Sequence, residues 1–160
     1  MACQGDWAYV HWASDLPTAK GLHINHKETL AVILAAYRWA HTWRNAKIRV
    51  FTDNVTVNAA INKGYSKHSQ LVNNALRELF WLSICFNFQI EAHFVPGIEN
   101  TLADYISRLV MPTYLKRLLA TLSLAHSAPS FIADIPQHVY PKALSLIFPQ
   151  VDIPCPWKPP

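Results

Sequence analysis

Proline is distributed unevenly along this chain, and that distribution limits where regular structure can form. Only Pro17 and Pro96 precede residue 111, and the other nine prolines lie between residues 112 and 160. Because proline lacks a backbone N–H and fixes its φ angle, it interrupts helices and central strands. We therefore expect one compact domain over residues 1–109, followed by residues 110–160 as a short helix and a proline-rich linker or tail.

Composition favours a folded, water-exposed protein. Hydrophobic residues make up 51% of the 160 residues and charged residues 15%, which predicts a real core. The net charge of +4 is compatible with a polyanionic partner but does not establish one. Its cysteines, Cys3, Cys85 and Cys155, are odd in number and far apart, which argues against a disulfide framework. Without a secretory signal or an apolar stretch of membrane-spanning length, we expect an intracellular protein, cytoplasmic or nuclear, with no membrane contact.

Residue periodicity predicts a mixed α/β layer fold. Alternating or β-branched segments predict strands, and apolar stripes with capping residues predict helices. The expected order is strand 7–12, extended segment 21–24, helix 26–44, strand 47–52, helix 55–62 ending at Gly64, helix 70–86 capped by Ser69, strand 88–95 and a helix from residue 100. Large aromatic residues at helical spacing are expected in the core: Trp39, Trp43, Phe80 and Trp81.

Three acidic residues stand at the ends of these elements. Glu28 falls in the first turn of the long helix, Asp53 directly follows a strand, and Asp104 falls in the first turn of the last helix. If the helices pack on the sheet, the three carboxylates converge at one rim. Converging carboxylates repel one another unless a cation neutralises them, and Mg²⁺ is the cation that suits hard oxygen ligands and a phosphate substrate. Two such ions, roughly 3.5–4 Å apart, support phosphodiester cleavage.

Each acid also has a purely structural interpretation. Asn25 and Glu28 have the spacing of a capping box, and so do Thr101 and Asp104. Asp53 precedes Asn54 in a pair that is typical of a turn and helix cap. The chemistry of single residues leaves both interpretations open.

Three local segments add a resemblance to a known family. The strings LHINHKETLAVILA, VFTDNVTVNAAINKG and HFVPGIENTLADYISRL occur in this order, and GDWAYVHW precedes them. Over about residues 5–109 the chain resembles the ribonuclease H domains of reverse-transcribing retroelements, most closely the DIRS-like and next the gypsy-like elements. Any one string alone is a weak signal, but the three together are specific.

The resemblance implies a ribonuclease H-like fold, a five-stranded mixed sheet flanked by helices. It implies hydrolysis of the RNA strand of an RNA–DNA hybrid with two Mg²⁺ or Mn²⁺ ions, beside a reverse transcriptase domain upstream in the same polyprotein. Glu28, Asp53 and Asp104 match three of the family's four acids. The fourth, on the first strand, lies upstream of anything present here, and Asp6 belongs to the second-strand motif instead.

The absent first strand is the central one in this family. Without it, the strands ending near Trp12 and Thr52 lose a partner, at a cost on the order of 1–3 kcal/mol for each buried unpaired backbone group. Total stability is typically about 5–15 kcal/mol, so this loss is large. We therefore expect a fragment or a decayed copy that is catalytically weak or dead.

Contacts to nucleic acid are expected beside the acids and after Gly64. Asn54 and Asn100 can touch the sugar–phosphate backbone, although both are equally good caps. Lys63, Tyr65 and Lys67 form a small basic and aromatic patch that can bind phosphate or stack on a base, although a solvated loop has the same composition.

Three histidines are read as structural. His93 is assigned to a strand rather than to a catalytic loop, and His23 and His26 lack a companion at metal-ligand spacing.

Three functional hypotheses remain open. The first is a ribonuclease H nuclease. The second is a non-catalytic remnant that binds nucleic acid or protein, and the third is an integrase-like transposase, which the ending ADYISR fits less well. Residues 114–126 have an amphipathic pattern and are interpreted as part of a linker.

Overall fold

The computed structural model describes residues 1–3, 6–13 and 16–108. The described elements, in chain order, are β1 (Ala2–Cys3), β2 (Asp6–Trp7), the 3-10 turn η1 (Pro17–Ala19), α1 (Ile24–Trp39), the 3-10 turn η2 (Ala40–Thr42), β3 (Lys47–Thr52), α2 (Val55–Lys63), α3 (Gln70–Phe86), β4 (Gln89–Phe94) and α4 (Thr101–Ser107). This order confirms the mixed α/β class. The expected helix and tail at residues 110–160 lie outside the described residues.

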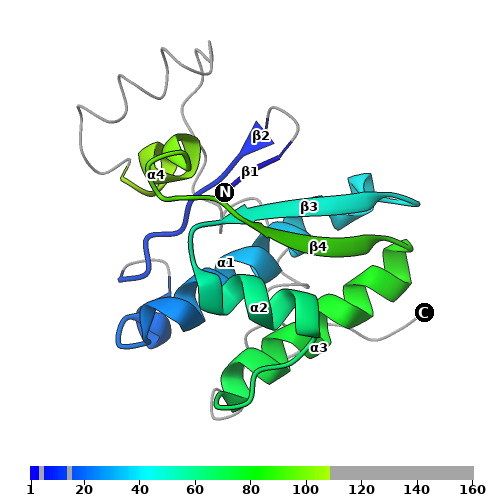
Figure 1. Ribbon diagram of the computed structural model, residues 1–160, viewed down its shortest axis with the longest axis horizontal. Coiled ribbons are helices and arrows are strands. Elements are labelled where there is room, and N and C mark those ends of the chain that lie inside the picture. The colour runs from blue at the N-terminus through cyan, green and yellow to red at the C-terminus, as the bar shows by residue number, and fades with distance from the viewer. Residues whose placement is uncertain (4–5, 14–15, 109–160) are drawn as a thin grey trace.

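The strands form two separate pairs. β3 and β4 are parallel and in register from Lys47 opposite Gln89 to Thr52 opposite Phe94. β1 and β2 form a short antiparallel pair. Helices α1, α2 and α3 lie together on one side of the β3–β4 pair (Figure 1). The five-stranded sheet that the resemblance implies is therefore not found among the described residues.

The core lies between this pair of strands and the three helices. Ile33 and Ala36 of α1 are fully buried there, and Trp39 and Trp43 are nearly so, as the two apolar stripes predict. The helix expected over 26–44 is shorter, because α1 ends at Trp39 and Trp43 follows η2. The expectation for α3 is wrong in part, because Phe80 and Trp81 are 57% and 54% exposed. Val72, Leu76 and Leu79 occupy the buried stripe of that helix, and Phe80 and Trp81 fall outside it.

The hydrogen-bond pattern of the β3–β4 pair determines which backbone N–H and C=O groups have no partner within the pair. Gln89 donates its N–H to the carbonyl of Ala46, and Val95 donates to Thr52, both at 2.9 Å. Bonding to the neighbouring strand alternates along a strand, so Ala92 of β4 directs its backbone groups to the opposite edge. By the same alternation Lys47, Arg49 and Phe51 of β3 face the edge away from β4, where the described strands provide no partner.

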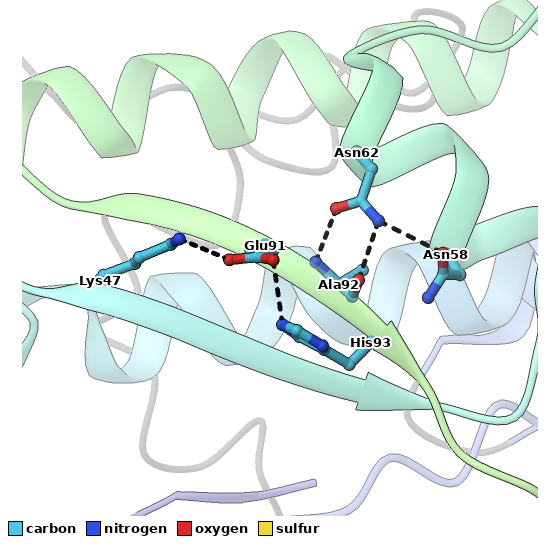
Figure 2. Close-up of polar contacts among 6 residues, drawn as sticks. All are labelled: Lys47, Asn58, Asn62, Glu91, Ala92 and His93. Carbon is cyan, nitrogen blue, oxygen red and sulfur yellow. Dashed lines mark hydrogen bonds and ion pairs between the residues drawn. The ribbon is translucent and has the colours of Figure 1, made fainter.

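Asn62 of α2 closes the outer edge of β4. Its side-chain amide donates to the carbonyl of Ala92 at 2.8 Å and accepts from the N–H of Ala92 at 2.8 Å (Figure 2). The amide thus imitates one residue of a neighbouring strand. Because Ala92 is buried, its backbone groups would otherwise lack partners.

Capping explains most of the helix boundaries. Ser69 accepts from the N–H of Val72 at 3.2 Å, and Gly64 ends α2 with a left-handed φ of 73°, both as predicted. The expected extended segment at 21–24 is wrong, because α1 already begins at Ile24. His23 is its N-cap and accepts from the N–H of Asn25 through Nδ1 at 3.2 Å. The strand expected over 7–12 is likewise shorter, since β2 ends at Trp7.

Among the described residues, no helix combines the length and the apolar character needed to span a bilayer.

Candidate functional site

Asp53 lies at the carboxyl end of β3, at the turn into α2. Its neighbour Asn54 fixes this turn, because the N–H of Asn54 donates to Oγ1 of Thr52 at 3.1 Å. The Oδ1 atom of Asn54 accepts from the N–H groups of Thr56 and Val57 at 2.9 and 3.2 Å, which caps α2. The Asp53 side chain is exposed at this position.

Glu28 lies in the first turns of α1, and its carboxyl interacts electrostatically with Asp53. Burial raises the pKa of the half-buried Glu28 carboxyl above its ordinary value, a hydrogen bond from the Asn54 side chain partly offsets that rise, and the negative charge of Asp53 adds to it. Two acids that are 25 positions apart in the sequence are therefore close in space. The expected joint site of Glu28 and Asp53 stays a prediction.

One oxygen of Glu28 has no hydrogen-bond partner among the described residues. Oε2 is buried and accepts no hydrogen bond from the described residues. A buried carboxylate oxygen without a donor costs free energy, and such an atom beside a second carboxylate suits a cation. The donor set, two carboxylates with hard oxygen atoms, fits Mg²⁺ or Mn²⁺.

The loop after β4 lies against the other side of Asp53. Asn100 donates from Nδ2 to Oδ1 of Asp53 at 3.4 Å. A Cβ atom placed on Gly97 would stand 3.1 Å from Oδ2 of Asp53, which is tighter than most carbon contacts. Glycine therefore allows this loop to approach the carboxylate closely.

Asp104 is engaged by a different partner. Its Oδ1 accepts from Nε of Arg108 at 2.6 Å, four positions further on and just after the end of α4. Over the described ranges, no group of three or more His, Cys, Asp or Glu side chains is arranged to hold a metal ion. The described residues therefore do not show Asp104 gathered with Glu28 and Asp53 into such a group.

Asn25 has a role that the sequence did not suggest. It was expected to cap the long helix with Glu28 in a capping box, and this is wrong because His23 is the cap. Instead Oδ1 of Asn25 accepts from Nδ2 of Asn54 at 2.8 Å. The only sequence signal for this contact is that both asparagines flank acids, three positions before Glu28 and one after Asp53.

The expected nucleic-acid patch after α2 is exposed. Lys63, Tyr65 and Lys67 all reach solvent, with Tyr65 58% exposed. Their accessibility is compatible with either a solvated loop or a binding patch, and the role of these residues stays a prediction.

The histidines have structural partners. His93 lies in β4, as predicted, beside Phe51 with a ring separation of 5.9 Å and within 3.2 Å of Glu91. Figure 2 shows His93 and Lys47 on either side of Glu91. His26 contacts Oγ of Ser69 through Nε2 at 3.0 Å, which links α1 to the start of α3.

Comparison with known proteins finds distant viral relatives. The chain is 32% identical over 89 residues to the enzymatic polyprotein of cauliflower mosaic virus strain D/H, which covers 56% of this chain and 13% of the viral protein. The polyprotein of strain Strasbourg is also 32% identical over 89 residues, with 56% and 12% covered. The match thus spans about one eighth of these relatives. No protein-family model matches the chain, and no solved structure matches it significantly.

Proposed function

We propose that this chain is the ribonuclease H domain of a reverse-transcribing retroelement and acts on the RNA strand of RNA–DNA hybrids. Its motif strings support this reading, and so does its distant similarity to a viral enzymatic polyprotein. The observation that carries the proposal is the approach of Glu28 to Asp53 with one oxygen of Glu28 buried and without a partner. In such a polyprotein, a reverse transcriptase domain upstream would be its partner.

In this proposal Glu28 and Asp53 hold divalent ions, and Asp104 completes the ligand set after it leaves Arg108. When bound, Mg²⁺ would supply an activated water and charge stabilisation for the leaving oxygen. The chain itself orients the acids through the turn at Asn54 and the close approach of Gly97. Asn100 and the patch of Lys63, Tyr65 and Lys67 are proposed to contact the hybrid.

A second function is favoured by the state of Asp104. The ion pair with Arg108 occupies its carboxylate, and the described residues lack a three-acid metal group. A non-catalytic domain that binds nucleic acid without cleaving it would have this arrangement.

A cleavage assay separates the two functions. The purified 160-residue chain is incubated with Mg²⁺ and a labelled RNA–DNA hybrid, with the Asp53→Asn variant as the matched control. Because the chain matches only three of the family's four acids, the nuclease proposal expects weak cleavage of the RNA strand that is lost in the variant. Binding of the hybrid without cleavage supports the second function, and neither binding nor cleavage contradicts both.

A further inference from the structure

We propose that Asn100 is a positioning residue that, together with Gly97, holds the Asp53 carboxylate in one orientation. Both residues belong to the β4–α4 loop, residues 95–100. This inference rests on the proposed function, because Asp53 is one of the metal ligands of that proposal. It adds to the proposed contact of Asn100 with the hybrid, since it assigns a partner to one N–H of the Asn100 amide.

The backbone of the β4–α4 loop is fixed at both ends. At its start, the N–H of Val95 donates to the carbonyl of Thr52 at 2.9 Å, which continues the bonding between the two strands. At its end, the N–H of Asn100 donates to the carbonyl of Pro96 at 3.2 Å, and the carbonyl of Asn100 accepts from the N–H of Asp104 at 3.1 Å. Asn100 therefore extends its side chain from a backbone that is bound on both sides.

The amide of Asn100 reaches the carboxylate of Asp53. Its Nδ2 atom donates to Oδ1 of Asp53 at 3.4 Å. An ionised carboxylate can only accept hydrogen bonds, so the NH₂ group is the side of the amide that faces it. Asn100 is partly buried whereas Asp53 is exposed, so the loop side chain is the better anchored of the two.

Gly97 lies against the other oxygen of the carboxylate. A Cβ atom built at this position would lie 3.1 Å from Oδ2 of Asp53 and 3.9 Å from its Cβ atom. Any larger residue would therefore press on the carboxylate. With Asn100 on Oδ1 and the loop backbone beside Oδ2, contacts on both oxygens restrict the rotation of the side chain.

This restriction favours ion binding. An exposed side chain otherwise samples several staggered rotamers, and it loses that conformational entropy when an ion fixes it. Two of the first N–H groups of α2 do not hold Asp53, because they donate to Oδ1 of Asn54. The β4–α4 loop therefore supplies the contacts that orient Asp53 before an ion binds.

Three substitutions separate this role from a role in folding. Asn100→Ser keeps a residue that caps helices, but its hydroxyl lies one bond closer to the backbone and cannot span a contact that is already 3.4 Å long. Gly97→Ala keeps Asn100 and introduces a Cβ atom that displaces Oδ2 of Asp53, while Gly97 has no positive φ that would oppose alanine. Ile98→Ser is the matched control, because Ile98 belongs to the same loop and is 86% exposed.

The test uses the full chain, first without metal and then with Mn²⁺. Three-bond NMR couplings between Hα and the two Hβ atoms of Asp53 report whether the side chain keeps one rotamer. We expect one rotamer in the parent chain and in Ile98→Ser, averaged couplings in Asn100→Ser and altered couplings in Gly97→Ala. Calorimetry should then show Mn²⁺ affinity about 10-fold lower in Asn100→Ser and unchanged in Ile98→Ser.

Three results each overturn the role of Asn100: Asp53 couplings that are averaged in the parent chain, couplings that Asn100→Ser leaves unaltered, or an Mn²⁺ affinity that Asn100→Ser leaves unaltered. Unaltered couplings in Gly97→Ala overturn the role of Gly97. The proposed function fails by a different result, namely Mn²⁺ binding that Asp53→Asn leaves unchanged. Because the couplings are measured without metal, they test the orientation of Asp53 in either case.

Discussion

Glu28 and Asp53 lie close enough for the charge of Asp53 to raise the pKa of the Glu28 carboxyl. Two acids that repel each other do not stabilise a fold. Their approach therefore has a cost in stability, and such costs concentrate at functional sites.

The first prediction concerns pH. Because the pKa of Glu28 is raised in the fold, its contribution to stability is present below the ordinary value of 4.5 and is lost as pH rises through the higher folded value. Two neighbouring groups also act on this carboxyl: the Asn54 side chain lowers its pKa, and the charge of Asp53 raises it. The free energy of unfolding of Glu28→Gln should therefore rise relative to that of the parent as pH increases above 4.5 and through the raised pKa. Urea titrations at each pH measure this, and a difference that stays constant would contradict it.

The second prediction concerns the edge of β4. Asn62→Ala removes both side-chain hydrogen bonds to the buried Ala92 and should cost about 2 kcal/mol of unfolding free energy. Asn58→Ala is the control, because Asn58 lies on the same helix and its side chain accepts a hydrogen bond from Asn62 at 3.3 Å without reaching β4 through any hydrogen bond among the described residues. It should change stability by about 0.5 kcal/mol or less. Equal effects of the two substitutions in urea unfolding would show that Asn62 does not support the strand.

The third prediction separates two tryptophans. Trp43 is buried, packs against Phe88 at a ring separation of 5.3 Å and donates to Sγ of Cys3, whereas Trp81 is half-exposed on α3. Trp43→Ala should cost about 3–5 kcal/mol. Trp81→Ala should cost about 0.5 kcal/mol. Both are measured by urea unfolding, and a large loss from Trp81→Ala would place that side chain in a core that the structure does not show.

The fourth prediction concerns Arg108. Both side chains of its pair with Asp104 are about half-exposed, and pairs of this kind contribute at most about 1 kcal/mol. If Asp104 joins the metal site when released, Arg108→Ala should raise Mn²⁺ affinity, by about 5-fold at most. Arg77→Ala removes the same charge from α3 and should leave the affinity unchanged. Calorimetric titration measures both, and weaker binding in Arg108→Ala would exclude this role of Asp104.

Local signals predicted much of the fold. Lys47–Thr52 alternates Ile48 and Val50 with charged neighbours, and the strand has these bounds. Gly64 and Ser69 act as stop and cap because glycine tolerates positive φ and serine accepts from a free N–H. Helix stops and caps depend on a few neighbouring residues, so they can be recognised in a sequence.

Features that depend on how the helices pack could not be predicted from the sequence. Helical spacing grouped Phe80 and Trp81 with the core, but spacing does not reveal which stripe of α3 meets a neighbour. His23 as an N-cap was missed because histidine is not among the usual capping residues. The contact of Asn25 with Asn54 joins residues 29 positions apart and depends on how α1 packs beside α2.

The positions of Glu28, Asp53 and Asp104 at element ends led us to expect that they converge, which stays a prediction, but the pairing of Asp104 with Arg108 was not expected. A carboxylate at i and an arginine at i+4 are a common helix pair, and this signal was present in the sequence.

The central claim is that Glu28 and Asp53 share a divalent-cation site. Paramagnetic broadening of backbone NMR signals by substoichiometric Mn²⁺ tests it most directly. We predict that signals around residues 28 and 53 broaden first, that excess Mg²⁺ restores them, and that Asp53→Asn removes the effect. Broadening that centres elsewhere, or that persists unchanged in Asp53→Asn, would contradict the claim.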